Sequence, residues 1–332
     1  MLELRYCLIF GMGLRMKFKE YFLYLLIFPI SGCSSQIDQL APGELESVSN
    51  RAQKNLVYVE GGEFFLGDAG DEVGRPFSSL LDNNKPPVKV RLDSYSISKY
   101  ETTWGDFLTY LRAKGKASEY TLENGFTRAV TLPISANDDP LSPNYRLKPA
   151  RSPNFSEAEG YCAWLAKQTG FEFALPTEAQ WEYAARSRGS IVPYATATGR
   201  FKEDPYLQRP SQYIDPATPV SGNALVHSSV KVERRPVGSY PPNPLGIHDM
   251  TGNVQEWTRD WYYPDFYEFA DRHNPHASEP PTNGEQERSV RDLAGHGNTV
   301  GGLDTVFSRS GASLDSPYQG FRCVVNSSKP VN

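Results

Sequence analysis

Cysteine is scarce in this sequence, which contains four in 332 residues. Cys7 and Cys33 lie close to the N-terminus, and Cys162 and Cys323 are the two that remain. Residues 163–322 therefore contain no thiolate, the ligand type that selects Cu(I) in proteins. From composition alone, Cys162 and Cys323 form either one disulfide or a pair of buried free thiols.

Positive charge is also in short supply. The chain has 34 basic and 39 acidic residues, a formal net charge of −5. Nucleic-acid-binding proteins normally carry a basic face, so this class of partner is excluded. An apolar share of 39%, with 12% aromatic residues, is enough for a large core and is unlike a disordered chain. Abundant Gly (27) and Pro (26) favour a loop-rich fold.

Familiar catalytic patterns are missing. The sequence has no Gly-rich phosphate-binding loop and no Ser, His and Asp arrangement that can be assembled into a hydrolytic site. His273, His276 and Glu279 are spaced like potential metal ligands, but Pro275 and Pro280 would break a helix there. We therefore expect these residues to form a solvated loop, not a metal site.

No apolar run is long enough for a comfortable transmembrane helix, which needs about 20 residues. Lys17 and Lys19 precede a short apolar stretch, residues 21–30, and the sequence Ile-Ser-Gly-Cys ends at Cys33. A basic start, a short apolar segment and small residues are typical of a secretory signal peptide. The last four residues resemble a bacterial lipobox, so we expect a lipid on Cys33. The alternative is an ordinary signal peptide followed by an incidental cysteine.

These features divide the chain into four parts. Residues 1–32 are the expected signal peptide with its lipobox, and translation from Met16 would give it a more conventional form. Residues 33–54 are polar and are expected to be a tether, residues 55–327 form one domain, and residues 328–332 are a tail. The mature chain would hold 30 basic and 37 acidic residues, a net charge of −7. We expect an exported, membrane-anchored lipoprotein in the periplasm or at the cell surface, with the outer membrane as its site.

Apolar periodicity predicts three helices in the domain. The first runs from Thr103 to Ala113, with its apolar residues on one face. The second begins with a capping box at Ser156 and stops by Gly170, and the third begins with a capping box at Thr177.

Strand signals are clearest near the start of the domain. Residues 56–59 and 63–66 flank Gly61 and Gly62, which predicts a hairpin. Residues 88–97 alternate between apolar and polar side chains, which predicts a further strand.

Four segments carry a family resemblance, and they are long enough to be specific. They are Tyr-Val-Glu-Gly-Gly-Glu-Phe-Phe-Leu-Gly at 58–67, Leu-Pro-Thr-Glu-Ala-Gln-Trp-Glu-Tyr-Ala-Ala-Arg at 175–186, Pro-Val-Gly-Ser-Tyr at 236–240 with Gly-Ile-His-Asp-Met-Thr-Gly-Asn-Val-Gln-Glu-Trp at 246–257, and Gly-Phe-Arg-Cys at 320–323. In this order and spacing they resemble the formylglycine-generating enzyme (sulfatase-modifying factor) family. The resemblance covers residues 55–327.

The resemblance carries expectations about the fold. It implies a loop-rich α+β fold related to the C-type lectin architecture. It also implies that Cys162 and Cys323 are bonded, because they match the family's structural disulfide, which joins the second helix to the last strand.

The resemblance also implies a calcium site. Asp249 and Glu256 are hard carboxylates on either side of a Gly252-Asn253 turn, and Ca²⁺ prefers carboxylate and carbonyl oxygens. From spacing alone, the simpler interpretation is that Asp249 caps a turn and Glu256 is solvated. In the family, the matching positions bind structural Ca²⁺. The implied ligands are Asp249, the backbone carbonyls of Gly252 and Val254, and Glu256.

The family's catalytic residues are not matched. Its enzymes oxidise a substrate cysteine to formylglycine with O₂, using copper held by two cysteines downstream of an Arg-Gly-Gly-Ser-type segment. The matching stretch here is Arg291-Asp292-Leu293-Ala294, and no cysteine follows it before Cys323. Copper catalysis of the family type is therefore not expected.

We expect a noncatalytic member of the family that acts as a scaffold, a partner-binding protein or a regulatory component. Its expected partners are the membrane, through the N-terminal lipid, and a protein, with no nucleic acid. One alternative is a divergent metal-dependent oxidase or oxygenase of the same family. Another is a carbohydrate-binding, lectin-like module, because aromatic residues crowd residues 257–263. Core packing of Trp257 is the simpler explanation of that crowding.

Overall fold

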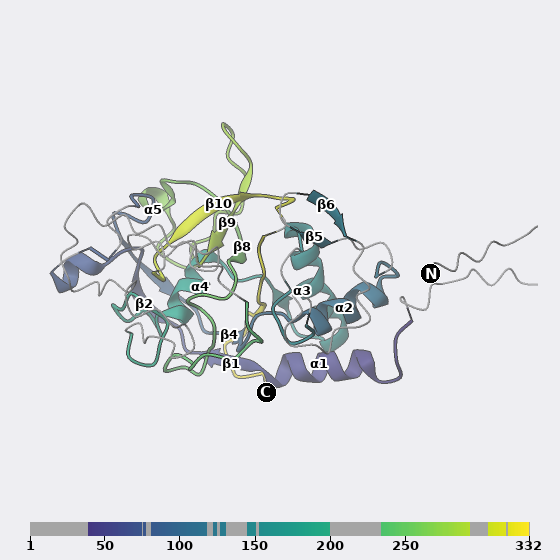
Figure 1. Ribbon diagram of the computed structural model, residues 1–332. Coiled ribbons are helices and arrows are strands. Elements are labelled where there is room, and N and C mark those ends of the chain that lie inside the picture. The colour runs from purple at the N-terminus through teal and green to yellow at the C-terminus, as the bar shows by residue number, and fades with distance from the viewer. Residues whose placement is uncertain are drawn as a thin grey trace, which may run out of the picture. The chain divides into compact units, whose positions relative to one another are not determined.

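Helices and short strands are interspersed along the chain (Figure 1). The computed structural model describes these residues: 39–74, 76–77, 81–117, 122–124, 127–130, 145–150, 153–199, 234–292, 305–316 and 318–331. The expected signal peptide and the lipidation site at Cys33 lie outside the described residues. Within the described ranges, no helix has the length and apolar character needed to cross a membrane.

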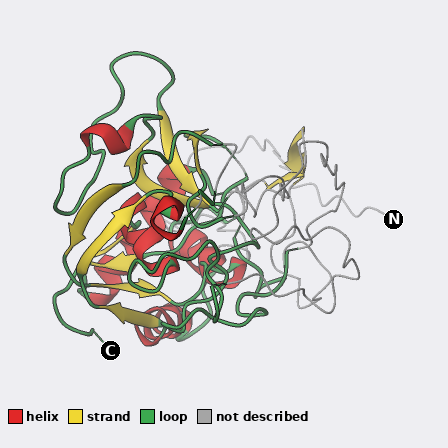
Figure 2. Ribbon diagram, turned by 90° about the vertical axis from the view of Figure 1, so that its left-hand side faces the viewer, coloured by secondary structure: helices red, strands yellow, loops and turns green. Residues whose placement is uncertain are grey.

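Helices and strands are both present, which confirms the α+β prediction, and long loops connect them (Figure 2). In chain order the elements are α1 (Glu44–Lys54), β1 (Leu56–Val59), β2 (Gly62–Leu66), the short 3₁₀ helix η2 (Gly70–Val73), β3 (Val88–Leu92), β4 (Tyr95–Ser98), α2 (Trp104–Ala113), β5 (Leu122–Asn124), β6 (Thr127–Val130), α3 (Phe155–Thr169), β7 (Phe173–Ala174), α4 (Glu178–Ala185), β8 (Glu256–Trp261), α5 (Phe266–Phe269), β9 (Glu287–Arg291), β10 (Arg309–Ser313) and β11 (Val324–Val325).

Antiparallel pairing joins strands that are far apart in the sequence. The largest sheet has the order β1-β4-β11-β7, so the last strand of the chain lies between β4 and β7. A second sheet has the order β10-β9-β8, while β2-β3 and β5-β6 form separate pairs. The main sheet is therefore complete only when the C-terminal strand β11 has paired with both β4 and β7.

Two apolar clusters contact the two faces of the main sheet. Adjacent residues of a strand point to opposite faces. In β11, Val325 packs in the cluster formed with α1, α2 and α3, whereas Val324 packs in the cluster formed with β2, β3 and α4. The first cluster is rich in aromatic edge contacts, such as those of Tyr161 with Tyr110 and with Phe321.

Two of the predicted helices have the predicted boundaries. Thr103 is the N-cap of α2, and its side chain accepts a hydrogen bond from the backbone N–H of Asp106. Thr177 caps α4 in a complete capping box with Gln180. Both boundaries could be predicted from the sequence, because a cap consists of hydrogen bonds between residues only three or four positions apart.

The predicted start of the second helix was wrong. The N-cap of α3 is Asn154, and the capping box pairs Asn154 with Glu157. Ser156 lies inside the helix, where its hydroxyl donates to the Asn154 side chain. Two overlapping box patterns were present, and because Asn and Ser are about equally good N-cap residues, the local pattern could not decide between them. The helix ends at Gly170, as predicted.

The predicted hairpin around Gly61 and Gly62 was also wrong. β1 pairs with β4, whereas β2 pairs with β3, so the two strands belong to different sheets. The predicted strand at residues 88–97 is divided into β3 and β4. A Cβ on Gly61 would lie 2.3 Å from the carbonyl oxygen of Leu92, so this glycine serves a close backbone crossing and not a turn.

The predicted tether at residues 33–54 contains a helix. α1 occupies Glu44–Lys54 and places Val48, 1% exposed, in the first apolar cluster. Thr109 and Arg112 of α2 both donate to the Glu44 carboxylate, at 2.7 and 3.0 Å. The folded domain therefore begins before residue 55, the predicted boundary.

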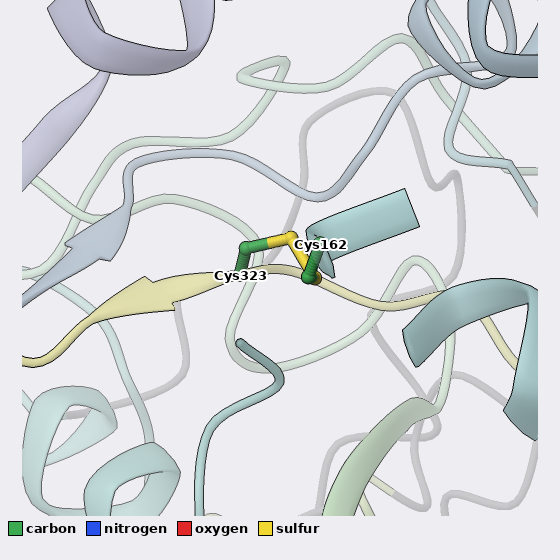
Figure 3. The surroundings of a disulfide bond; sticks show 2 residues. All are labelled: Cys162 and Cys323. Atoms are coloured by element: carbon green, nitrogen blue, oxygen red, sulfur yellow. A yellow bond between two sulfur atoms is a disulfide. The ribbon is translucent and has the colours of Figure 1, made fainter. Parts of the chain in front are cut away.

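A disulfide joins α3 to the segment that leads into β11 (Figure 3). Its members are Cys162 and Cys323, the pair implied by the family resemblance. Both side chains are buried, with 0% and 1% exposure. The bond ties the C-terminal strand to the helical half of the core.

Candidate functional site

The loop at residues 249–255 is held in an uncommon backbone conformation. Asp249, Gly252 and Asn253 have φ angles of 57°, 99° and 71°, in the left-handed region. Glycine, asparagine and aspartate tolerate this region best. The sequence can therefore make a tight turn just before β8, and the turn aims backbone and side-chain groups inward.

The acidic side chains on this loop receive backbone hydrogen bonds. Asp249 Oδ2 accepts from the N–H of Gly238 at 2.6 Å. Asp292, just after β9, accepts from the N–H of Gly252 at 2.7 Å. The loop is thus anchored to two neighbouring segments.

Glu101 reaches the same loop from the segment between β4 and α2. Its Oε2 accepts from the Asn253 amide at 2.7 Å. Among the described residues, its Oε1 and the Oδ1 of Asp249 are buried and have no hydrogen-bond partner. Burial raises the pKa of both carboxyl groups, and the charge of Asp249 raises the pKa of Glu101 further. Two buried acceptors without partners are compatible with a hard cation beside Asp249.

Glu256, the other carboxylate of the implied calcium site, has different partners. Arg322 Nε donates to its Oε2 at 2.8 Å, and Arg322 Nη2 donates to its Oε1 at 2.7 Å. Trp181 Nε1 also donates to Oε2, at 3.1 Å. Both oxygens are therefore engaged by the core, so Asp249 fits the implied ligand set and Glu256 does not in this arrangement.

The described ranges contain no group of three or more His, Cys, Asp and Glu side chains that could hold a metal ion. A site at the 249–255 loop would have to rely on carbonyl oxygens such as those of Gly252 and Val254. His273 bonds to the exposed Asp93 at 2.9 Å. His276 is half-buried, and burial together with nearby Arg259 lowers its pKa to about 4.

A buried network of charges lies beside this region and was not predicted from the sequence. On α4, Glu178, Glu182 and Arg186 follow one another at intervals of four and share one face. Arg291 of β9 donates to Glu178 at 2.8 Å and to Glu182 at 2.7 Å. Arg309 of β10 also bonds to Glu178. All five side chains are 0% exposed, so each charge depends on its partner.

The network fixes the protonation state of its central carboxylate. Burial alone would raise the pKa of Glu178, but Arg309 and Arg291 lower it to about 2. The four-residue spacing of the charges is also common on a solvated helix face, so the alanine and aromatic residues between them were the one sequence signal that pointed to burial. The network joins α4 to β9 and β10, the strands on either side of residues 293–304.

That segment, residues 293–304, lies outside the described residues. The sequence shows that it contains no cysteine, and the disulfide uses both cysteines of the domain. The chain's own residues therefore do not fit the family's copper centre.

The aromatic segment at residues 257–263 is mostly committed to packing. Trp257 is fully buried, and its indole N–H donates to the carbonyl of Pro153 at 3.0 Å. One face of Trp261 is covered by the guanidinium of Arg288, 3.7 Å from the ring centroid. Core packing of Trp257 is confirmed.

Comparison with known proteins adds three relatives. "Serine/threonine-protein kinase pkn1" of Chlamydia pneumoniae is 27% identical over 283 residues, 82% of this chain and 38% of the relative. This chain thus spans less than half of that relative. The formylglycine-generating enzyme of Streptomyces coelicolor is 29% identical over 68% of this chain and 75% of its own length. "Inactive C-alpha-formylglycine-generating enzyme 2" of Bos taurus is 26% identical over 67% of this chain and 76% of its own length.

The solved structure of PvdO from Pseudomonas aeruginosa has a similar fold. It superposes with a TM-score of 0.57 at 25% sequence identity, covering 81% of this chain and 93% of that one. The family model described as "Sulfatase-modifying factor enzyme 1-like domain" matches residues 42–327. The match begins near α1, in agreement with the packing of that helix onto the domain. This chain therefore belongs to the formylglycine-generating enzyme (sulfatase-modifying factor) family.

Proposed function

We propose that this protein is a noncatalytic family member that serves as a lipid-anchored, partner-binding component outside the cytoplasm. The observation that carries the proposal is the use of cysteine. Cys162 and Cys323 are bonded to each other, and residues 163–322 contain no other cysteine. Thiolates are the ligands that select Cu(I), so the domain lacks the groups on which the family's reaction depends.

A relative supports the same proposal. The bovine protein that is 26% identical to this chain is named as an inactive formylglycine-generating enzyme. That relative shows the family's sequence in a protein named as inactive, and we assign the network around Glu178 in this chain to stability.

The direct test is an assay for formylglycine. The purified protein is incubated with copper, O₂ and a cysteine peptide, and the peptide is analysed by mass spectrometry. We expect no conversion, whereas an active family enzyme run in parallel as a control converts the peptide. Formylglycine in the test sample would overturn the noncatalytic proposal.

Membrane attachment is the second part of the proposal. A lipid on Cys33 would place the domain close to a membrane, with residues 34–43 between the lipid and α1. The substitution Cys33→Ala should release the protein from membranes or block its processing. Unchanged membrane association and unchanged electrophoretic mobility would argue against lipidation.

Calcium binding is the third part. We place the ion at Asp249, whose Oδ1 has no partner among the described residues, together with the carbonyls of Gly252 and Val254. Glu256 could join only by giving up its bonds to Arg322. An ion that binds the folded state alone stabilises it by about 2.7 kcal/mol at a hundredfold excess over Kd.

For a domain of this size, each kcal/mol of stabilisation raises Tm by about 2–4 °C at most. Removal of the ion with a chelator should reverse the rise in Tm. Asp249→Ala should remove most of the calcium response. Asp271→Ala, which changes an exposed aspartate elsewhere, should leave the response intact. A melting curve that does not respond to calcium or chelator would contradict the assignment.

A further inference from the structure

Three basic side chains gather where β8 and β9 pair. Arg259 lies on β8, Arg288 lies on β9, and His276 lies in the loop that connects α5 to β9. All three side chains are half-buried. None of them belongs to the loop at residues 249–255, and none lines the cavity of about 820 Å³ between α1 and α2.

The backbone of Arg259 holds the three residues together. Its carbonyl oxygen accepts a hydrogen bond from Arg288 Nη1 at 2.6 Å, and the His276 ring is hydrogen-bonded to the same backbone. Its N–H donates to the carbonyl of Pro176, just before α4, at 2.9 Å. The group is therefore built on well-anchored main chain.

The guanidinium of Arg288 is held by aromatic rings. It lies 3.7 Å from the ring centroid of Trp261 and 4.2 Å from that of Phe155. Stacking of this kind fixes the plane of a guanidinium and leaves its edge to donate hydrogen bonds. The donors of Arg288 are thus oriented before any ligand arrives.

Two buried donors in this group have no acceptor. Among the described residues, neither Arg259 Nε nor Arg288 Nε has a hydrogen-bond partner, although both atoms are buried. Within the same part of the chain, the Arg259 side chain forms no ion pair or hydrogen bond, and Arg288 forms no ion pair. Buried polar atoms are normally hydrogen-bonded, so two such atoms on neighbouring arginines indicate a missing acceptor.

The field at this place is positive. The pKa of the His276 ring is lowered to about 4, first by burial and then by the charge of Arg259, with a further contribution from Arg288. A neutral water molecule could accept hydrogen bonds from the arginines, but it could not offset two half-buried positive charges. The missing acceptor is therefore expected to carry negative charge.

Nearby carboxylates do not supply that charge. Both oxygens of Asp260 are used by the backbone, because they accept from the N–H groups of Glu178 and Ala277 at 2.8 and 2.9 Å. Burial also raises the pKa of Asp260 to about 7, so the group is only partly ionised near neutral pH. Glu159 acts on Arg288 from an exposed position, where water screens its charge.

We propose that Arg259 and Arg288, with His276 beside them, form a binding site for a phosphate group. Two uncompensated guanidinium charges match a divalent anion, and guanidinium donors fit the oxygens of a tetrahedral oxyanion. Arg259 offers its whole guanidinium, and Arg288 offers the edge that the Arg259 carbonyl leaves unused. The site does not depend on the noncatalytic, lipid or calcium assignments, since it uses none of their residues.

The first test uses sodium sulfate as the probe, because sulfate has the shape of phosphate and stays divalent throughout the titration. The ring signals of labelled histidines are followed by NMR in the detergent-solubilised full-length protein. Sulfate is compared with sodium chloride at the same ionic strength, so that screening is equal in both samples.

In sulfate the pKa of His276 should rise by about one to three pH units relative to chloride, because a bound anion favours the protonated ring. His273 is the internal control, since it is exposed and bonded to Asp93, and it should titrate alike in both salts. Equal pKa values for His276 in sulfate and chloride would overturn the proposal.

A matched pair of variants tests the arginines. Arg259→Gln should fold normally, because this side chain has no partner within the described residues, and it should weaken sulfate binding about tenfold or more. Arg272→Gln removes the same charge from an exposed position and should bind sulfate like the parent. Sulfate binding by Arg259→Gln with the parent's affinity would contradict the site.

Competition at pH 7 then identifies the form of the ligand. Inorganic phosphate and O-phosphoserine are each titrated against bound sulfate, and both are expected to displace it. Stronger displacement by phosphoserine would identify a phosphate carried on a larger molecule, whereas stronger displacement by inorganic phosphate would identify the free ion. Failure of both to displace sulfate would overturn the assignment to phosphate.

Discussion

Arg322 shows how one residue can decide the role of another. Its guanidinium engages both oxygens of Glu256, and both side chains are 0% exposed. A buried carboxylate that loses its cation is left without compensation, which typically costs about 3–5 kcal/mol. Arg322→Met should therefore lower the free energy of unfolding by that amount, measured by urea denaturation followed by circular dichroism.

The control for this change is an exposed ion pair. Lys89 and Glu63 lie 2.8 Å apart, with side chains 61% and 59% exposed. Such pairs contribute at most about 1 kcal/mol, so Lys89→Met should have little effect. Equal losses in the two variants would show that the Arg322–Glu256 pair is not the buried unit described above.

The carboxyl group of Glu178 makes the free energy of unfolding depend on pH. Its folded pKa is about 2, and its reference value is 4.5. Because the folded pKa is the lower one, its contribution to stability is complete above pH 4.5 and is lost as the pH falls toward 2. The shift corresponds to about 3 kcal/mol.

Glu178→Gln should therefore be less stable than the parent at pH 7 and should lose less stability between pH 5 and pH 3. Urea midpoints measured across this range report the difference. Glu63→Gln, at an exposed site, is the control and should retain the parent's slope. A variant at Glu178 whose slope equals that of the parent would contradict the role given to this carboxylate.

At the scale of the elements, local chemistry was predictable and long-range pairing was not. The caps at Thr103 and Thr177 lie within a few residues of the amides they bond to, so the sequence contains their full pattern. The pairing of β1 with β4 depends on a crossing near Gly61, which no local pattern reveals. Likewise, charges on α4 look solvated until Arg291 of a distant strand is placed beside them.

Helix α1 was also missed from the sequence, because most of its residues are polar and few apolar side chains mark its buried face. Val48 is 1% exposed and packs into the first apolar cluster. Val48→Ala should lower the free energy of unfolding by about 1–2 kcal/mol, as expected for loss of buried methyl groups. Glu46→Ala, on the exposed face of the same helix, should be close to neutral. A neutral result for both, in thermal melts, would mean that residues 44–54 behave as the tether suggested by their composition.

At the scale of the whole molecule, the fold depends on its last strand. β11 completes the main sheet between β4 and β7, and its two valines face different apolar clusters. The family resemblance made the last strand predictable, because the segment Gly-Phe-Arg-Cys lies immediately before β11. The cavity between α1 and α2 was not predictable, because it is assembled from segments that lie far apart in the sequence.

The disulfide is the covalent link in this architecture. It joins residues separated by 161 positions, and it holds the C-terminal segment against α3. Closing so long a loop restricts the unfolded chain, and removal of a native disulfide typically costs about 2–5 kcal/mol. The double variant Cys162→Ala/Cys323→Ala should therefore fold with a lower Tm and a lower urea midpoint than the parent. Because both cysteines are buried, reductant applied to the folded parent and removed before the melt should leave its Tm unchanged. Peptide mapping without reduction should recover one linked pair, and alkylation of both thiols in the unreduced protein would show that the bond is absent.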